Sequence, residues 1–264
     1  LLLIFFFLII LIFTAVISKK YLTPIRKITE HFKQFQKGDI DLNDELSVES
    51  DDEVGELAKW SNVFLKSFKE KKTMEQDMLE GERLLKSISD ATNVLLATSD
   101  YSTAFNNALE ILGESTMSDR VYIFEVHECE EKGESLATLR VKWSREGFKH
   151  GENNMKLINL SFNEDGVSDW YKALSSNEMV SGLIKDLTGP KQKIMASEGI
   201  LSILIVPIFI DSYFWGFIEF HDCTEERVWS EVEKNTLRIA AGSIGGAVKR
   251  IKTEHALQNV LKDD

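Results

Sequence analysis

Apolar residues fill the start of the chain almost completely. The run Leu1–Ile17 is interrupted only by the polar Thr14 and stops abruptly before Lys19 and Lys20. A membrane-spanning helix needs about 20 apolar residues. The run starts at residue 1 without a methionine, so we expect residues 1–18 to be the C-terminal part of a transmembrane helix. A signal peptide would need a charged segment before the run and a small-residue cleavage site after it.

Basic residues follow this run closely and predict its orientation. Lys19, Lys20, Arg26 and Lys27 lie within the distance over which positive charge keeps a loop on the cytoplasmic side. We therefore expect the lipid bilayer of the inner (cytoplasmic) membrane to hold the apolar helix. Residues 19–264 would then lie in the cytoplasm.

The pattern beyond the membrane run changes to a heptad seam. Apolar residues alternate at steps of four and three, at Tyr21, Ile25, Ile28, Phe32 and Phe35. Such a seam needs a partner helix. Pro24 lies near the predicted start of this helix, where a missing amide costs little, and Gly38 lies where a C-terminal cap is expected.

A second amphipathic helix is predicted after an acidic connector over residues 39–53. Asp51 or Asp52 suits its N-terminal cap. Its seam positions are Val54, Leu57, Ser61, Phe64 and Phe68. A charged stretch over residues 73–87, with Gly81 as a weak point, continues as a predicted connecting helix.

The residues over 19–72 resemble the HAMP family. The resemblance rests on Pro24 before the apolar pair Ile25 and Ile28, on Gly38, and on the run that contains Asp52, Glu53, Gly55 and Leu57. It implies a parallel four-helix bundle made by a homodimer, which converts motion of the membrane helix into a change of helix packing. A simple coiled-coil stalk is the alternative.

Short β-rich runs separated by Gly, Asn, Asp and Ser replace the helical pattern between residues 88 and 250. Strands are predicted at Val121–His127, Leu136–Trp143, Leu201–Ile210 and Tyr213–His221, a short helix at Ser168–Leu174 and a long helix from Ser230. The Asp211-Ser212 step predicts a hairpin, and Pro207 predicts an edge position or a bulge. The long helix is expected to bury a stripe at Leu237, Ile239, Ala240, Ile244 and Val248. The predicted class is α+β, an antiparallel sheet flanked by helices.

This region resembles the GAF family. The resemblance rests on DRVYIFE at 119–125, VPI at 206–208, WGFIEF at 215–220, HDC at 221–223 and ERVWS at 226–230. It implies a sensory fold that binds a small molecule or only dimerises. A bilin is not expected, because His127-Glu128-Cys129 lacks the order of the family's attachment site. A cyclic nucleotide is not expected either, because the Asn-Lys-Phe-Asp-Glu set of those members is missing.

Aromatic residues are the candidates for a ligand pocket in this domain. Trp143, Phe148, Trp170 and Trp215 flank or occupy the turn-rich region where such a fold places its ligand-facing loops, although core packing is the simpler explanation for each. No metal site is expected, because the adjacent strand residues His221, Asp222 and Cys223 point to opposite faces.

Net charge and the distribution of potentially catalytic residues argue against two classes of function, nucleic-acid binding and catalysis. The chain has 264 residues and a formal net charge of −12, which disfavours nucleic acid as a partner. The five histidines are scattered and no phosphate-binding glycine loop is present, so we expect no catalytic residues in this segment.

We therefore predict a homodimeric signalling relay. Residues 251–264 would form an exit helix to an output domain beyond Asp264, either a histidine kinase or a diguanylate cyclase. The rival hypotheses are a thiol-dependent methionine sulfoxide reductase that uses Cys129 or Cys223 and a purely structural stalk with an empty domain.

Overall fold

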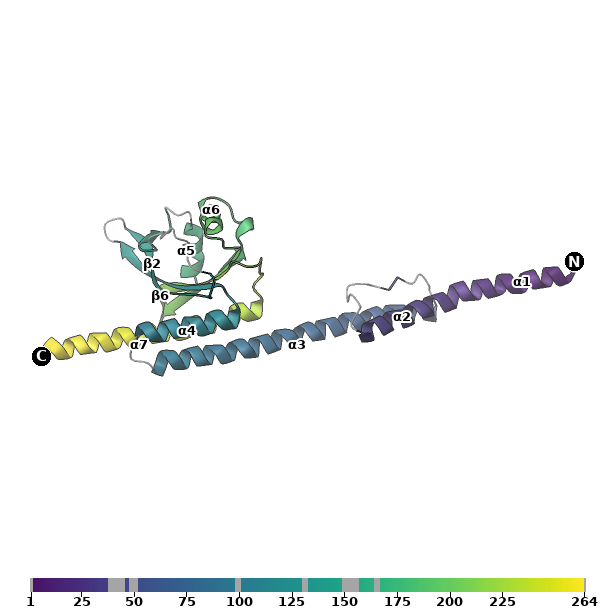
Figure 1. The fold of residues 1–264 in the computed structure, drawn as a ribbon, viewed down its shortest axis with the longest axis horizontal. Helices are drawn as coiled ribbons and strands as arrows, with labels where there is room; N and C mark the ends of the chain where they lie inside the picture. The colour runs from purple at the N-terminus through teal and green to yellow at the C-terminus, as the bar shows by residue number, and fades with distance from the viewer. Residues whose placement is uncertain are drawn as a thin grey trace. The chain divides into compact units, whose positions relative to one another are not determined.

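The computed structural model describes residues 2–37, 46–47, 52–97, 101–129, 133–148, 157–163 and 167–263. The chain forms two compact units, Leu1–Met78 and Leu79–Asp264. The first unit consists of helices, and the second contains a sheet with helices on both faces (Figure 1).

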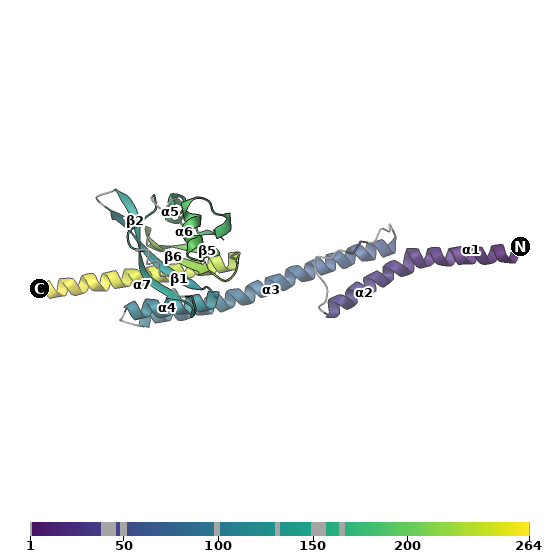
Figure 2. The same ribbon diagram turned by 45° about the horizontal axis from the view of Figure 1, so that its top comes forward.

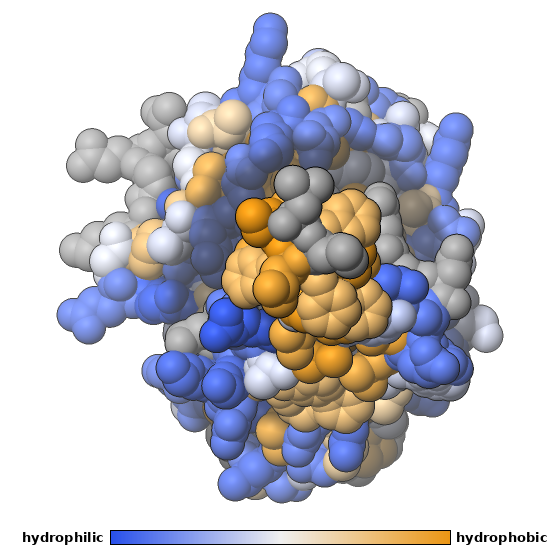
Figure 3. Space-filling view, turned by 90° about the vertical axis from the view of Figure 1, so that its right-hand side faces the viewer, coloured by the Kyte–Doolittle hydropathy of each residue, from blue (hydrophilic) through white to orange (hydrophobic). Residues whose placement is uncertain are grey.

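The first unit starts with a helical stretch that continues past the membrane run. Helix α1 spans Leu2–Ile17, a π-helical turn η1 follows at Ser18–Leu22, and α2 spans Thr23–Lys37. Among the residues described, the stretch Leu3–Lys37 is the one helix long and apolar enough to cross a membrane. Figure 3 shows apolar side chains gathered at the end of the molecule where this helix lies.

Pro24 lies inside this helical stretch rather than at a fresh start. It is the second residue of α2, but α1 leads into α2 without a break. Proline has no amide hydrogen to donate to the preceding turn. A π-turn directly precedes it, in which the amide and the hydroxyl of Thr23 both donate to the carbonyl of Ser18, the hydroxyl over 3.1 Å. Pro24 therefore lies near the start of its helix, as predicted, although that helix follows α1 and η1 without a break.

Helix α3, Glu53–Ala97, begins with the predicted cap. The Asp52 Oδ1 accepts hydrogen bonds from the amides of Val54 and Gly55, at 3.1 and 3.4 Å. Glu53 adds negative charge to the first turn, where the helix dipole favours it. Gly38 and most of the acidic connector lie outside the described residues.

The predicted heptad seam divides into two faces. Ile28 of α2 packs with Val54 and Ala58 of α3 in a small core within the unit. Leu57 and Phe64, which the sequence placed on the same seam as Val54, are each 49% exposed. The seam therefore supplies one face for α2 against α3 and leaves an apolar face uncovered.

The sheet of the second unit has the strand order β3-β2-β1-β6-β5-β4, and all neighbours are antiparallel. Its strands are β1 (Arg120–Cys129), β2 (Glu134–Ser144), β3 (Leu160–Ser161), β4 (Val180–Leu183), β5 (Ser202–Ile210) and β6 (Tyr213–Asp222). The four predicted strands and the α+β class are confirmed, whereas the short β3 and β4 were not predicted.

Long helices cover one face of this sheet and short ones the other (Figures 1 and 2). The end of α3, α4 (Tyr101–Thr116) and α7 (Glu231–Asp263) form the main core with one face. Helices α5 (Ser168–Ser175) and α6 (Pro190–Ser197) belong to the other face, together with the turn η2 (Ile184–Asp186). The predicted helix at Ser168–Leu174 is thereby confirmed.

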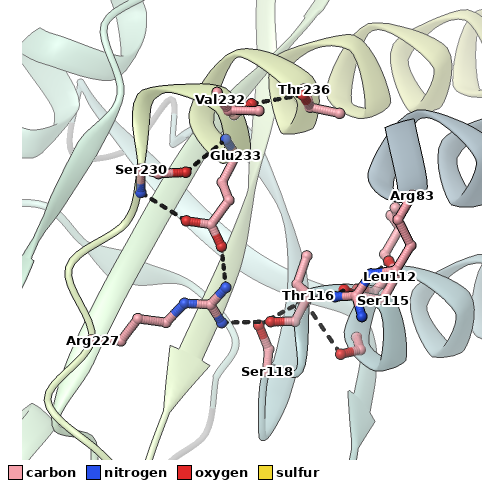
Figure 4. Close-up of polar contacts among 11 residues, drawn as sticks. Arg83, Leu112, Ser115, Thr116, Ser118, Arg227, Ser230, Val232, Glu233 and Thr236 are labelled. Carbon is pink, nitrogen blue, oxygen red and sulfur yellow. Dashed lines mark hydrogen bonds and ion pairs between the residues drawn. The ribbon is translucent and has the colours of Figure 1, made fainter. Parts of the chain in front are cut away.

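Helix α7 begins with a capping box (Figure 4). The amide of Ser230 donates to Glu233 Oε2 over 2.7 Å, and the Ser230 hydroxyl accepts from the Glu233 amide over 3.2 Å. Arg227 connects this cap to α4, because its guanidinium pairs with Glu233 and donates to the carbonyl of Thr116. The start of α7 is thus fixed to the end of α4.

The buried stripe of α7 differs from the predicted one at a single position. Leu237, Ala240, Ile244 and Val248 are buried, but Ile239 is 54% exposed. Ile239 is next to the buried Ala240 in sequence, but it lies outside the face of α7 that packs on the sheet through Leu237 and Ile244. The prediction for Ile239 was wrong.

The β5–β6 hairpin turns at Asp211 and Ser212 as predicted, since Ile210 pairs with Tyr213. Asp211 has φ 55°, a conformation that aspartate tolerates in turns. Strand β4 pairs only with Ser202–Ile205, so Pro207 lies beyond the end of β4 on that side of β5, and a bulge follows between Ile208 and Phe209. Both features predicted from Pro207 are present.

Candidate functional site

A cavity of about 430 Å³ lies on the face of the sheet that carries the short helices α5 and α6. Cavities of 300–1,000 Å³ are typical of small-molecule sites. Alternating residues of β1 and β6 form its floor, because every second side chain of a strand points to the same face. These floor residues are Arg120, Tyr122 and Phe124 from β1 and Phe217, Glu219 and His221 from β6.

Most of the cavity wall is apolar and aromatic. The rings of Phe124 and Phe217 are stacked with centroids 5.1 Å apart, and Phe162 lies 6.2 Å from Phe217. Trp170 and Leu174 of α5 close the wall and are 7% and 1% exposed. Flat apolar ligands fit such a wall, because aromatic rings favour offset stacking and edge contacts.

Buried polar residues gather along Arg120, Glu219 and His221 at the cavity. The His221 Nε2 lies 3.0 Å from Glu219 Oε2, and both side chains are buried. Arg120 donates to the backbone carbonyl of Glu198 over 3.1 Å, and its Nη1 is 3.9 Å from the Glu198 carboxylate. The cavity therefore combines an apolar wall with a compact charged region.

Tyr122 joins the apolar and polar residues of the floor. Its ring meets that of His221 edge-on, with centroids 4.9 Å apart. Burial raises the pKa of Tyr122 to about 12, against the opposing effect of the Arg120 charge. The phenol is therefore un-ionised at neutral pH.

The structure separates the four aromatic residues predicted for a pocket. Trp170 lines the cavity, whereas Phe148 is not among its lining residues. Trp143 pairs with Val121 across the β1–β2 ladder, so both face the long helices, and the Trp143 ring packs over Gly113 of α4. Trp143 was predicted to line the pocket, but it lies on the opposite, helix-covered face of the sheet.

Trp215 also lies on the helix-covered face, for a different reason. Ile208 pairs with Gly216 and Phe209 with Phe214, so Trp215 is the extra residue of a bulge. The bulge reverses the alternation and turns the Trp215 indole to the main core, where its Nε1 donates to Glu125 over 3.0 Å. Strand alternation without the bulge would have pointed Trp215 to the cavity.

The polar residues of the cavity were missed at the sequence level, although a signal existed. Arg120, Glu219 and His221 lie on the same alternating faces of β1 and β6 as Phe124 and Phe217. Charged residues are rarely buried, so their presence on the apolar face of a strand is unusual. Polar residues at these positions in the sequence therefore indicated a site.

The two cysteines are free. Burial raises the pKa of the Cys223 thiol, although the nearby Arg120 acts in the opposite direction. A reactive thiol needs a lowered pKa, so this environment opposes a thiol-dependent activity at Cys223. Within the described ranges, no group of three or more His, Cys, Asp or Glu side chains could hold a metal ion.

These features define a sensory fold with a cavity between a sheet and short helices. The GAF domain family model matches residues 100–248, and the HAMP domain model matches residues 17–59. The chain belongs to the GAF domain family and carries a HAMP domain ahead of its GAF domain. The two resemblances predicted from sequence motifs are confirmed.

Relatives at the sequence level include a histidine kinase. The chain is 40% identical over 177 residues to "Methanogenesis regulatory histidine kinase FilI" of Methanothrix harundinacea, covering 67% of this chain and 20% of that protein. It is 24% identical over 177 residues to an uncharacterized protein of Azorhizobium caulinodans, covering 64% and 23%. The chain thus spans about a fifth of the length of these curated relatives.

The fold also matches solved structures. The phycocyanobilin-bound GAF domain of a cyanobacterial phytochrome superposes with a TM-score of 0.52 at 17% identity, covering 66% of this chain and 97% of that one. At this identity the match shows the shared fold alone.

Proposed function

We propose that this chain is the relay and sensory segment of a membrane-anchored receptor. The observation that carries the proposal is the order of the parts. An apolar helix leads into the HAMP domain, and α3 supplies both the second HAMP helix and the residues Ile88, Ala91 and Leu95 of the GAF core. One helix therefore belongs to both signalling domains.

The proposed division of the chain follows from this order. Residues 1–18 would lie in the inner membrane, 19–72 would form the relay, 73–87 the connecting helix and 88–250 the sensory domain, all but the first in the cytoplasm. Residues 251–263 lie in α7, and the segment 251–264 would continue toward an output domain. The relationship to a histidine kinase favours a kinase output over a diguanylate cyclase.

A homodimer is part of the proposal. HAMP domains and histidine kinases are dimeric signalling modules, and the uncovered face of the first unit offers a surface for a second copy. Leu57, Phe64 and Phe68 of α3 are 49%, 49% and 40% exposed, and Ile25 and Phe32 of α2 are 43% and 38% exposed. Apolar side chains repeated at heptad steps pack against a parallel copy of the same helix.

The stimulus would pass from the relay through α3 as a change in helix packing, and a ligand in the GAF cavity would bias the same equilibrium. Such a coupling requires two arrangements within a few kcal/mol of each other. The cavity wall and its polar residues support small-molecule binding, with Trp170 as the lining residue that the sequence pointed to.

Insertions in α3 test the relay. One residue inserted between Lys72 and Thr73, both exposed, rotates the following helix by ~100°. Seven residues inserted at the same point restore the phase to within about 20° and serve as the control. We expect the single insertion to change autophosphorylation of the full-length receptor and the seven-residue insertion to leave it close to normal. Equal output from both variants and the parent would refute mechanical relay through α3.

A further inference from the structure

Basic side chains follow the apolar helix of the first unit directly. Lys19 and Lys20 lie in η1, Arg26 and Lys27 lie near the start of α2, and all four are exposed. The segment 18–29 that contains them has no acidic residue. It is therefore a positively charged patch in a chain whose formal net charge is −12.

The position of this patch along the helix suits contact with a bilayer surface. A helix rises about 1.5 Å per residue, so Lys19 and Lys27 are roughly 12 Å apart along the axis. Attraction to an anionic surface extends over about one Debye length, roughly 8 Å at physiological ionic strength. Long basic side chains add reach toward that surface. With α1 in a bilayer, all four charges would lie close enough to be attracted by anionic headgroups.

One of the four cations lies close to an acidic residue of α3. The Lys20 Nζ is 3.9 Å from Asp52 Oδ2, and the negative charge of Glu53 also acts on Lys20. The Lys20 side chain is 55% exposed, and 3.9 Å is longer than a hydrogen bond. Exposed ion pairs of this kind contribute little to stability. A lipid phosphate can therefore take Lys20 from Asp52 at small cost.

Asp52 connects this ion pair to the start of the second relay helix. Its Oδ1 accepts hydrogen bonds from the amides of Val54 and Gly55, at 3.1 and 3.4 Å. The carboxylate thus caps α3 with one oxygen and faces Lys20 with the other. Loss of Lys20 from this contact would leave the cap without the cation that helps to hold the carboxylate in place.

The location of the patch favours lipid over nucleic acid, although both present phosphate groups. A long polyanion would also meet Glu53 and Glu56 in the first turn of α3. A bilayer surface needs only the residues that directly follow the apolar helix. Clusters of four or more basic residues immediately after a membrane helix are typical of binding to anionic lipids.

We propose that Lys19, Lys20, Arg26 and Lys27 bind the headgroups of anionic lipids, and that these headgroups compete with Asp52 for Lys20. The inference rests on the proposed membrane anchoring of residues 1–18. It adds the class of lipid that is bound and a contact through which the charge of the membrane acts on the start of α3.

Lipid retention tests the binding. The full chain is reconstituted in nanodiscs of equal parts phosphatidylcholine and phosphatidylglycerol, and native mass spectrometry measures the lipids that stay bound after release. We expect phosphatidylglycerol to be retained at least about fivefold over phosphatidylcholine, because one basic side chain near an anionic surface already adds about this factor. Soluble glycerol phosphate should not displace the lipid, because it lacks the bilayer that holds the headgroups beside the helix.

Variants assign the preference to the patch. Replacement of all four cations by glutamine should reduce the preference to about onefold. The matched control removes the same number of charges from exposed lysines farther along α3 and should keep the preference. The control residues are Lys66, Lys71, Lys72 and Lys86.

Amide hydrogen exchange tests the competition for Lys20. In nanodiscs with phosphatidylglycerol, the amides of Val54 and Gly55 should exchange about two- to fivefold faster than in phosphatidylcholine alone, because the cap loses its exposed ion pair. Lys20→Gln should show the faster exchange in both lipids and no further response to phosphatidylglycerol.

The outcomes separate this inference from the proposed function. Extraction of the chain from vesicles by alkaline carbonate would refute the membrane anchor and the lipid site together. An anchored chain that retains both lipids equally overturns the lipid site alone. Loss of the preference in the control variant, or displacement by glycerol phosphate, also overturns it. A clear lipid preference with unchanged exchange at Val54 and Gly55 overturns the competition for Lys20.

Discussion

Two neighbouring glycines of α7 differ in how closely their backbone approaches strand β5. Gly245 of α7 lies against β5, and a Cβ placed on it would be 2.2 Å from the carbonyl oxygen of Phe209. Gly246, the next residue, has open space at the same position. Gly245 therefore lets the α7 backbone approach β5 closely, which a side chain at this position would prevent.

This contrast predicts effects of opposite sign. Gly245→Ala should lower the free energy of unfolding by about 1–3 kcal/mol, because the methyl group forces α7 away from β5. Gly246→Ala should raise it by about 0.5–1 kcal/mol, because alanine loses less backbone entropy in a helix. Urea denaturation of both variants measures the difference. A loss of stability of the same size in both would contradict the packing explanation.

At the scale of elements, hydrogen bonds tie helix α7 to the C-terminal end of helix α3. The Arg250 guanidinium of α7 donates to the carbonyls of Leu95 and Leu96, at 2.6 and 3.0 Å, in the last turn of α3. Those carbonyls have no partner within α3, and the helix dipole makes them attractive to a cation. Lys252 adds a contact to Glu125 of β1 over 3.2 Å.

Charge contacts explain the acidity of Glu125. Burial opposes its ionisation, but the hydrogen bond from Lys252 and the charges of Lys252 and Arg140 outweigh burial and lower the pKa of Glu125. A carboxyl with a lowered pKa in the folded state stabilises the fold above its ordinary pKa. That contribution is lost as the pH falls through the lowered value. The tie between α7 and β1 therefore persists at neutral pH.

Removing the guanidinium should loosen the junction of α3 and α7. Arg250→Ala should lower the free energy of unfolding by about 1–2 kcal/mol, because the last carbonyls of α3 lose charged hydrogen bonds at a partly exposed position. Amide hydrogen exchange near the end of α3 should accelerate. Lys249→Ala is the control, since the Lys249–Asp211 pair is exposed and should contribute little. Unchanged exchange at the end of α3 in Arg250→Ala would rule out this tie.

At the scale of the whole molecule, the exposed apolar face of α2 and α3 is a candidate surface for binding another chain. Phe64 is 49% exposed, although its ring lies 6.1 Å from Phe32 and 6.4 Å from Phe68. Clustered exposed aromatic residues mark interaction surfaces on otherwise polar helices. A second copy of the chain, aligned in parallel, would cover this face.

Substitution at the centre of that face should weaken the dimer. Phe64→Ser should raise the dissociation constant at least about tenfold, because burial of a phenylalanine side chain contributes about 1.5–3 kcal/mol. Lys66→Ser, at an exposed polar position of the same helix, should leave the constant unchanged. Analytical ultracentrifugation in detergent measures both. A Phe64→Ser chain that dimerises like the parent would exclude this face as the interface.

The sequence by itself determined the elements and the families. An unbroken apolar run, a heptad repeat and a β-rich stretch with turn residues each follow from local side-chain periodicity, so α1, α3, the main strands and the start of α7 were predictable. The caps Asp52 and Ser230 were recognisable for the same reason, because a cap acts on amides two or three residues away.

Only the tertiary structure decided which face each side chain occupies. Periodicity groups residues on a common face but does not say what covers that face, so Leu57 and Val54 shared a predicted seam and yet differ in burial. One bulge residue turned Trp215 away from the cavity, and cross-strand pairing placed Trp143 on the helix side. Glu219 and His221 lie two residues apart on β6, so alternation alone puts them on one face, but only the tertiary structure decided that this face is buried and lines the cavity.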